Sequence, residues 1–550
     1  MTLTTLKISE LALPLEAASD PEAPLRSLLK AYRIPSDAQL SVIKRAIDAR
    51  KRPPQHVYTV AVDVDAGSAE RLSKRANVGA HRPLRYHPLR LRQAPDGPRP
   101  LIIGAGPAGL FAAHALATAG ARPIVLERGK PVERRGRDVS KLYSTGTLDE
   151  ESNVCYGEGG AGTYSDGKLY TRVGDPRVRR VMELLVDSGA RSDILFVNRP
   201  HIGTDKLVKI LKRMRERLVE LGGEIRFDSR VEGLRIVDGG ITGVTLRGGE
   251  VIDTQRVILA TGHSAREVWH ELERKGLPLE CRPFAVGFRI EHPQTLIDLA
   301  RYGQPSQKGL LPAADYSLTY NEGDSDARRG VWSFCMCPGG VVVTTPTHAG
   351  ELCINGMSHA SRSGRYANSA MVVSVGPEDY AREGFTGTFA GVNFQLQVEQ
   401  RAFEAGGGAF VAPAARVSDF VEGRESSSLP DTSYRRGLQP ANLSTLYPGS
   451  VTATLRRALG RFDRKIRGFV TEEAKLIGVE TRTASPIRLP RDERGVAVGC
   501  RGLYPAGEGM GYGGGIVSAA VDGMRAAEHL LLELGATTEH DGIDPVDQRI

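Results

Sequence analysis

The sequence predicts an α/β fold with three parts: a Rossmann-type dinucleotide-binding domain that is split in two, a β-rich domain inserted between its halves, and a small α+β N-terminal domain. Three observations predict this arrangement. A short apolar strand at 101–103 leads directly into a glycine pattern and a helix. Residues 284–421 include two segments, VWSFCMCPGGVVVTTP (331–346) and ELCINGM (351–357), whose Val, Cys, Ile and Thr content is typical of strands. From about residue 502 the chain returns to a strand, a glycine-rich loop and a helix.

Domain boundaries follow from composition. A chain of 550 residues is too long for one hydrophobic core. The Pro/Gly-rich run at 93–100 indicates a linker, and the strands and helices before it favour a ferredoxin-like βαβ arrangement. The predicted domains are a small α+β N-terminal domain (1–95), the first part of the nucleotide-binding domain (99–283), a β-rich substrate or cap domain (284–440) and the C-terminal part of the nucleotide-binding domain (441–550).

Basic residues are concentrated near the start of the chain. The formal net charge is +8, and residues 1–98 hold 16 Lys and Arg against 10 Asp and Glu, a net of +6. This asymmetry can indicate a nucleic-acid partner, but an ordinary solvated basic face is the favoured interpretation. Only Tyr32, Tyr58 and Tyr86 offer aromatic rings for base stacking in this segment, which argues further against nucleic acid.

Several classes of protein are not expected. No apolar run approaches the roughly 20 residues that span a bilayer, and the N-terminus has acidic residues and no long apolar core, unlike a signal peptide. We therefore expect a cytoplasmic protein without a membrane partner. The six cysteines show neither a disulfide framework nor the spacing of a zinc site, so no structural metal is expected.

The segment that follows the linker carries a complete dinucleotide fingerprint. Gly104 permits a tight turn, Gly106 lets the backbone approach a pyrophosphate, and Gly109 lets helix and strand pack closely. Glu127 ends the second strand, 23 positions after Gly104, where it can accept hydrogen bonds from both ribose hydroxyls. The expected cofactor-binding residues here are Gly104, Gly106, Pro107, Ala108, Gly109, Glu127, Arg128 and Arg135, the last as a group that neutralises the pyrophosphate.

Three further features favour FAD over NAD. An apolar strand ends in Ala-Thr-Gly at 260–262, and Val231 lies on a strand where the backbone can contact adenine. Glu508 stands between glycines after another strand, where it can bond the ribityl chain, and a helix from Ile516 would direct its N-terminus at the flavin. The expected contacts are Val231, Thr261, Gly262, Gly507, Glu508, Gly514, Gly515 and Ile516. No His or Cys is placed for a flavin link, so non-covalent FAD is expected.

At these residues the chain resembles a widespread bacterial family of FAD-dependent dehydrogenases, related in fold to glutathione reductase and p-hydroxybenzoate hydroxylase. The resemblance covers most of the chain, and it implies FAD binding and a small N-terminal domain. It rests on GAGPAGLFAA (104–113), SNVCYGEGGAGTYSDGKLYTR (152–172), NRPHIGTDKL (198–207), ATGHSAR (260–266), FCMCPGG (334–340) and YPAGEGMGYGGGI (504–516).

The glycine-rich run at 157–167 contains the first candidates for chemistry. Its glycines, Gly160 among them, suggest a backbone packed against the flat flavin ring. Ser165, Asp166 and Lys168 would then lie near flavin N5 as catalytic candidates, and a loop anchored by its own side-chain turn is the alternative. His263 is a further acid–base candidate, although a structural histidine is the commoner case.

Two cysteines and two arginines complete the candidates. Cys335 and Cys337 are two apart, which on a strand places them on one face. Redox exchange with the flavin is one hypothesis for them, and packing in a sheet above the active site is the favoured alternative. Arg362 and Arg365 could clamp a substrate carboxylate.

The leading prediction is an FAD-dependent oxidoreductase that moves a hydride between a small-molecule substrate and flavin N5. No second G-x-G-x-x-G both follows a strand and opens a helix outside the flavin loops, so a stable NAD(P)H domain is not expected. NAD(P)H then acts as a transiently bound donor, or the substrate itself is the reductant. An FAD monooxygenase and an RNA-associated flavoprotein are the alternatives. Neither the substrate nor the oligomeric state follows from the sequence.

Overall fold

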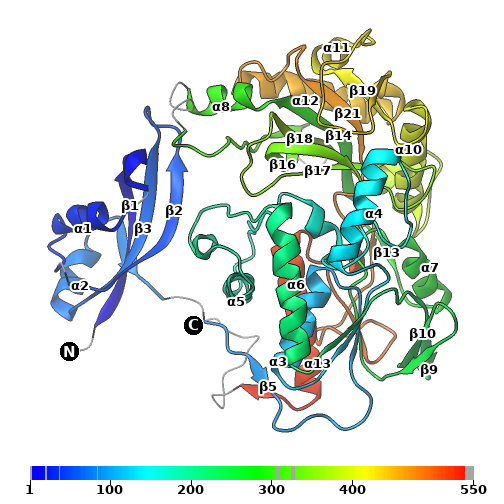
Figure 1. Cartoon of the computed structure of the whole chain (residues 1–550), viewed down its shortest axis with the longest axis horizontal. Helices are drawn as coiled ribbons and strands as arrows, with labels where there is room; N and C mark the ends of the chain where they lie inside the picture. Colours follow the sequence, from blue (N-terminus) through cyan, green and yellow to red (C-terminus); the bar gives the residue numbers. More distant parts are fainter. Residues whose placement is uncertain are drawn as a thin grey trace.

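The computed structural model describes residues 3–18, 21–35, 37–82, 85–303, 309–323 and 329–538. Figure 1 shows a small N-terminal domain beside a larger body, in which a nucleotide-binding domain lies against a β-rich domain. The predicted α/β class and the β-rich insertion are confirmed. Residues 539–550 of the predicted C-terminal part lie outside the described residues.

The N-terminal domain has ferredoxin-like topology, as predicted. Its four strands form one antiparallel sheet in the order β2-β3-β1-β4, which is the order of a βαββαβ unit. Leu6 and Ile8 point from β1 into a core that also buries Leu25 and Leu29 of α1. The elements are β1 (Thr4–Leu13), α1 (Glu22–Lys30), β2 (Leu40–Asp48), β3 (Gln55–Val64), α2 (Ala66–Ser73) and β4 (Val78–Ala80).

A five-stranded parallel sheet, in the order β23-β12-β6-β7-β8, forms the centre of the nucleotide-binding domain. Four of its strands are buried along their whole length, as expected for a parallel sheet covered on both faces. The strands are β6 (Leu101–Ile103), β7 (Ile124–Leu126), β8 (Glu224–Arg226), β12 (Val257–Leu259) and β23 (Leu503–Pro505), and a separate antiparallel sheet contains β9 (Val231–Val237), β10 (Gly240–Leu246) and β11 (Val251–Asp253).

Two glycines bring the helices of this domain close together. A Cβ atom on Gly109 would lie 1.9 Å from the carbonyl oxygen of Gly104, and one on Gly523 would lie 2.0 Å from that of Ala108. A side chain at Gly109 would therefore push α3 away from the loop that follows β6. A side chain at Gly523 would push α13 away from α3. Figure 1 shows α3, α6 and α13 side by side. The helices are α3 (Pro107–Thr118), α4 (Val132–Thr145), α5 (Pro176–Asp187), α6 (Thr204–Glu220), α7 (Arg266–Arg274) and α13 (Ile516–Glu533).

The β-rich domain is built on an eight-stranded sheet in the order β15-β16-β18-β14-β21-β19-β20, with β17 paired to β16. The strands are β14 (Phe284–Pro293), β15 (Thr319–Glu322), β16 (Arg329–Thr344), β17 (Ile354–Met357), β18 (Tyr366–Val375), β19 (Ala412–Arg416), β20 (Leu438–Pro440) and β21 (Lys475–Glu480). Its helices are α8 (Gln294–Tyr302), α9 (Pro377–Arg382), α10 (Ala390–Ala405), α11 (Val417–Glu422) and α12 (Gly449–Lys465). Strands β13 (Glu280–Cys281) and β22 (Ile487–Arg488) pair at its base.

The predicted boundary at residue 440 is wrong. Strand β21 lies between β14 and β19, and α12 packs on β16 and β18, so the β-rich domain continues to about residue 482. An antiparallel sheet can be completed by a strand that is distant in sequence, and strand composition alone does not reveal where that happens.

The predicted boundary at residue 95 also needs correction. Strand β5 (Leu89–Arg90) pairs with β24 (Thr537–Thr538), and Leu89 is buried in the core of the nucleotide-binding domain. The N-terminal domain therefore ends before residue 89. It touches the rest of the chain through β2, where the Arg45 backbone donates to Phe196 and accepts from Asn198.

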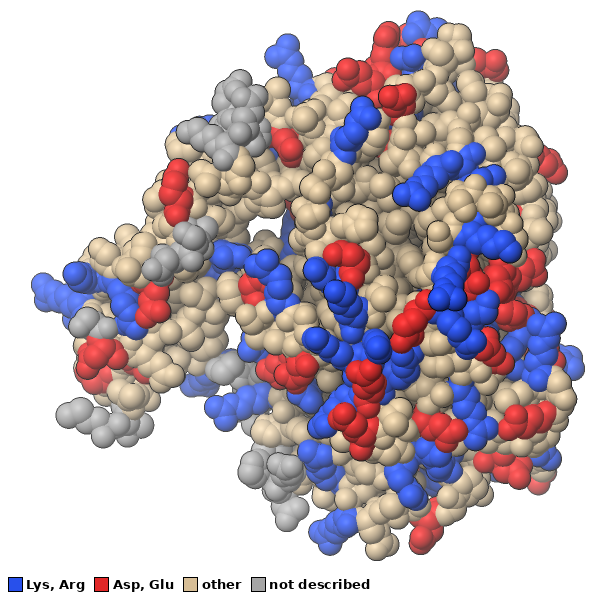
Figure 2. Space-filling model, in the orientation of Figure 1, with Lys and Arg blue, Asp and Glu red and all other residues tan. Residues whose placement is uncertain are grey.

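Acidic side chains accompany the basic residues of the N-terminal domain. Arg26 pairs with Glu22 and Arg50 with Asp48. Figure 2 shows Lys and Arg mixed with Asp and Glu over the visible face, without one continuous basic stripe.

Candidate active site

A cavity of about 600 Å³ lies where the nucleotide-binding domain meets the β-rich domain. Its volume is within the range of ligand and cofactor pockets, about 300–1,000 Å³. Its walls include the residues that follow β6, β7, β12 and β23, and open α/β sheets bind their ligands at this carboxyl edge. Of the residues predicted to bind the cofactor, only Gly109 and Arg135 do not line the cavity, and among the other candidates Cys337, Arg362 and Arg365 do not.

The first glycine turn is shaped for a close ligand. Gly104 has a φ of +103°, and a Cβ atom there would lie 2.4 Å from the carbonyl oxygen of Ala260. Gly106 is the N-cap of α3 and Pro107 is its first residue, so no side chain caps the free N–H groups of the first turn. Free N–H groups at the positive end of a helix are the groups that bind a pyrophosphate.

Glu127 joins three loops beneath this turn. One carboxylate oxygen accepts the backbone N–H groups of Gly129 and Gly157, each at 2.9 Å, and the other accepts that of Ala105 at 2.8 Å. A carboxylate has about four acceptor positions. The structure therefore leaves room for one ribose hydroxyl, where the sequence predicted two.

The two predicted arginine contacts have different surroundings. Arg128 lines the cavity, pairs with Glu151 and Glu267, and stacks over the ring of Tyr156 at 3.9 Å. The prediction that Arg135 binds the cofactor is wrong, because this side chain is fully buried away from the cavity. It donates to the backbone carbonyls of Asn153, Val154, Gly157, Glu158 and Gly160. Arg135 is the internal support of the glycine-rich loop.

The C-terminal glycine loop forms another wall of the cavity. Burial raises the pKa of Glu508 to about 7, although a hydrogen bond from the Gly515 backbone acts in the opposite direction. Gly515, the N-cap of α13, has a φ of +75° and open space where a Cβ atom would be. Gly514 has no left-handed backbone, and a Cβ atom there would make ordinary contacts with Glu508. Of these two positions, Gly515 is therefore the one whose backbone conformation requires glycine.

The walls of the cavity fit FAD. The two open helix N-termini, those of α3 and α13, suit a pyrophosphate and the electron-rich edge of a flavin respectively. Thr261 lines the cavity, and its buried hydroxyl has no hydrogen-bond partner in the described part of the chain, as expected for a group that meets a ligand. Val231, Gly262 and Gly160 line the same space.

Asp166 is the centre of an ion cluster and is unsuited to proton transfer. It is buried and pairs with Lys168 at 3.0 Å, with Arg362 through two hydrogen bonds, and with the Ser358 hydroxyl. Burial raises its pKa, but Lys168, Arg362 and Ser358 together hold the pKa well below its usual range. Arg362 is thus occupied by Asp166, and the prediction of a carboxylate clamp at this residue is wrong.

Ser165 and Lys168 have different roles. The Ser165 hydroxyl donates to the Gly162 carbonyl and accepts the Gly167 N–H, which is the turn-anchoring alternative considered from the sequence. Lys168 reaches the cavity with a side chain that is 34% exposed. Burial disfavours its charge, but Cys337 and Asp166 raise its pKa overall, so it remains protonated.

His263 is neutral at physiological pH. Burial lowers the pKa of His263 to about 4, and the nearby Arg482 acts in the same direction. Its Nδ1 lies 2.9 Å from the Ser264 hydroxyl. His263 lines the cavity and can exchange a hydrogen bond there, but it is not charged at neutral pH.

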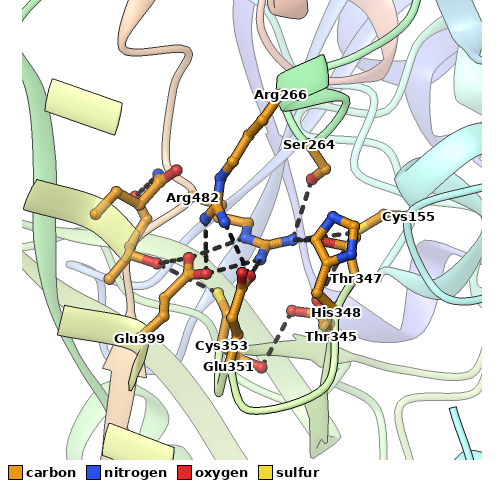
Figure 3. A network of polar contacts seen from close by, with 12 residues as sticks. Cys155, Ser264, Arg266, Thr345, Thr347, His348, Glu351, Cys353, Glu399 and Arg482 are labelled. Atoms are coloured by element: carbon orange, nitrogen blue, oxygen red, sulfur yellow. Dashed lines mark hydrogen bonds and ion pairs between the residues drawn. The ribbon is translucent and has the colours of Figure 1, made fainter. Parts of the chain in front are cut away.

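A buried charge network joins the two domains, and sequence reasoning missed it. Figure 3 shows Arg266 of α7 and Arg482 both directed at Glu399 of α10 and at Glu351. Arg482 also lines the cavity and donates to the hydroxyls of Ser264 and Thr347. The four charges come from segments that are far apart in sequence, so spacing gives no signal. Removing one partner from such a network leaves an unpaired buried charge, which strongly destabilises the folded protein.

Sequence reasoning also missed the wall that the β-rich domain contributes. Phe334, Asn355 and Thr483 line the cavity beside Cys335. Tyr170, three residues after the glycine-rich run, also lines the cavity. Asn355 and Thr483 lie in other segments than the FCMCPGG motif that contains Phe334 and Cys335, so only the folded sheet brings these residues together.

Two features, a membrane-spanning helix and a cluster of metal ligands, are absent from the described residues. No helix among them is both long and apolar enough to cross a bilayer. They also contain no group of three or more His, Cys, Asp or Glu side chains that could hold a metal ion.

The fold and this cavity define an FAD-dependent oxidoreductase, and the comparison with family models agrees. Residues 99–149 match an FAD binding domain, and residues 283–483 match an "FAD-dependent protein, C-terminal domain-like" model. The latter range coincides with the β-rich domain as the structure defines it. Residues 5–63 match a domain of unknown function. The cofactor is FAD.

The chain belongs to the same family as an uncharacterized protein of Clostridium beijerinckii, to which it is 41% identical over 502 residues, covering 90% of this chain and 92% of the relative. Among solved structures, glycerol-3-phosphate dehydrogenase from Bacillus halodurans, complexed with FAD, is 11% identical, covers 81% of this chain and 66% of its own, and has a TM-score of 0.33. L-amino acid deaminase from Proteus vulgaris is 13% identical, covers 83% and 96%, and has a TM-score of 0.32.

Proposed function

We propose that this protein is an FAD-dependent dehydrogenase that moves a hydride between a small organic substrate and flavin N5. When bound, FAD supplies a two-electron acceptor at that atom. The observation that carries the proposal is that one cavity joins the dinucleotide loops to a chamber under the β-rich sheet. Phe334 gives this chamber an apolar surface, and the side-chain amide of Asn355 gives it a polar group for a substrate.

The net positive charge around the chamber favours a substrate that carries an anionic group. Lys168 and Arg362 carry two positive charges against the single negative charge of Asp166. Lys168 is the member of this cluster that is both protonated and partly exposed in the cavity. A fixed positive charge there stabilises a substrate carboxylate, or the negative charge that develops during flavin reduction. The role proposed for Lys168 is therefore orientation and charge stabilisation.

The source of electrons is proposed to be the substrate itself or a transiently bound NAD(P)H. Outside the flavin loops, the sequence has no second dinucleotide fingerprint that both follows a strand and opens a helix. A protein with a permanent nicotinamide site would be expected to show one.

The test follows the fate of the reduced flavin. The holoenzyme is reduced anaerobically with dithionite and mixed with oxygen, with a quinone or with NAD(P)+, and reoxidation is followed in the flavin spectrum. The proposal predicts that a quinone or NAD(P)+ reoxidises the flavin faster than oxygen does. Fastest reoxidation by oxygen, together with consumption of NAD(P)H, would instead indicate a monooxygenase.

A further inference from the structure

Cys335 and Cys337 lie at an irregular point of β16. The strand loses its register with β18 between Phe334 and Cys337, and Cys335 has a φ of +46°. A residue other than glycine rarely adopts this left-handed conformation, and such strain concentrates at functional sites. On a regular strand the two Cα atoms would be about 6–7 Å apart, at the limit of what a disulfide spans. The irregularity bends the strand here, and the Cys337 thiol donates back to the Cys335 backbone carbonyl at 3.3 Å.

Two cations flank the pair. The Nζ atom of Lys168 lies 3.9 Å from the Cys337 sulfur, and Nη2 of Arg289 lies 3.5 Å from it. The same Arg289 nitrogen donates to the Cys335 carbonyl at 2.6 Å, which supports the bend, while its Nη1 pairs with Glu480 at 2.7 Å. Positive charge beside the pair favours the form in which one of the two thiols is ionised, and a thiolate is the nucleophile in disulfide chemistry.

The two thiols are also unequal in acidity. The hydrogen bond from Cys337, reinforced by Lys168 and Arg289, lowers the pKa of Cys335 to about 6 against the opposing effect of burial. Burial, followed by the effect of Cys335, raises the pKa of Cys337 well above its ordinary value. One ready thiolate beside one protonated thiol suits a dithiol that forms and breaks a disulfide.

The position of the pair connects it with the flavin. Cys335 is partly exposed and lines the cavity that also contains Gly162, Gly514 and Lys168. Cys337 is buried behind it. Both are free thiols in this structure. Simple packing would need neither the left-handed backbone nor the two flanking cations.

We propose that Cys335 and Cys337 form a redox-active dithiol that exchanges two electrons with the bound flavin. As the bond between the two sulfur atoms forms, the S–H bond of Cys337 is lost, and the Cys335 thiolate and the Cys337 thiol together give up two electrons and one proton. Bound FAD would take up both electrons and that proton, which gives the anionic reduced flavin FADH−. The reverse step reduces the disulfide and reoxidises the flavin. This inference goes beyond the proposed hydride transfer, because it needs FAD in the cavity but no particular substrate.

The test counts electrons. The full-length holoenzyme is treated with a thiol oxidant, freed of reagent, and titrated anaerobically with dithionite. The wild type should take up about four electrons per FAD, because the disulfide adds a two-electron couple to that of the flavin. Cys335→Ser and Cys337→Ser should each take up about two. Cys500→Ser removes a buried thiol outside the cavity and should still take up about four.

Mass spectrometry provides a second readout that needs no variant. After oxidation and alkylation, the tryptic peptide 330–362 should carry one alkyl group, on Cys353, and a link between Cys335 and Cys337. Reduction before alkylation should give three alkyl groups. An uptake of about two electrons by the oxidised wild type, or a fully alkylated peptide, would overturn the proposal. FAD content is measured separately, so loss of the cofactor is not mistaken for loss of the dithiol.

Discussion

Glu127 accepts the backbone N–H of Gly157 at 2.9 Å, so the acid that ends the second strand of the nucleotide fold also anchors the glycine-rich loop. The same oxygen accepts the N–H of Gly129, and the other oxygen accepts that of Ala105. One carboxylate therefore fixes both the pyrophosphate turn and the glycine-rich loop that packs directly against it. Its contribution to FAD binding is mainly the organisation of these loops, with one acceptor position left for the cofactor.

Glu127→Ala should weaken FAD binding by about 1.5–3 kcal/mol, because charge-assisted hydrogen bonds to the loops and the ribose are lost. Equilibrium dialysis of the apoprotein against FAD measures this change. Glu250→Ala, which removes an exposed acid that pairs with Arg226 outside the cavity, is the matched control and should bind FAD as the wild type does. Wild-type affinity in Glu127→Ala would show that other groups hold both the loops and the ribose.

Gly515→Val should lower the midpoint potential of the bound flavin by roughly 10–40 mV, as expected when the N-terminus of a helix no longer stabilises the reduced anion. Valine strains the φ of +75° and projects its branched side chain into the cavity. Redox titration against a reference dye measures the change.

Gly437→Val is the control for this effect. Gly437 has a φ of +86° and open surroundings, but it does not line the cavity. It carries the same backbone strain and should leave the potential unchanged. An unchanged or raised potential in Gly515→Val with full FAD occupancy would mean that the N-terminus of α13 does not act on the flavin.

FAD affinity should rise with pH between about 6 and 8. Burial holds the pKa of Glu508 near 7, and hydroxyl donors from the ribityl chain favour the ionised form, so FAD binding releases a proton from this group. Affinity is then lowest where Glu508 is protonated before binding, and it rises by at most about tenfold per pH unit. Titrations of the apoprotein with FAD at several pH values measure the slope.

Glu508→Gln should flatten this pH profile. Glu158 is the control, because burial also raises its pKa to about 7 but its side chain does not line the cavity. Glu158→Gln should retain the wild-type slope. A slope that persists in Glu508→Gln would assign the titration to a different group.

Deleting residues 1–82 should leave a protein that still binds FAD, because the ferredoxin-like domain has its own core and sheet. Deleting residues 1–95 also removes β5 and the buried Leu89, which should cost about 2–3 kcal/mol more in unfolding free energy. Denaturant unfolding and flavin content compare the two. Equal stability would show that the pairing of β5 with β24 contributes nothing, and loss of FAD from both would make the N-terminal domain part of the cofactor site.

The sequence predicted those parts of the cofactor site whose residues all lie within one short segment. The turn at Gly104, the strand before it and Glu127 lie within one βαβ unit, and the structure brings them together as the fingerprint requires. Arg135 was misassigned, because a basic residue near this turn has the same sequence appearance whether it meets a phosphate or backbone carbonyls. The network of Arg266 and Arg482 depends on contacts between distant segments, so only the folded chain reveals it.

The most direct test of the account is the identity of the cofactor and how it is held. The purified full-length protein is precipitated with acid, and the flavin in the supernatant is identified by chromatography and counted against the protein. The account predicts about one FAD per chain, released completely, because two glycine loops and two helix N-termini hold it without a covalent bond. FMN in place of FAD, or a flavin that stays with the precipitated protein, would contradict it.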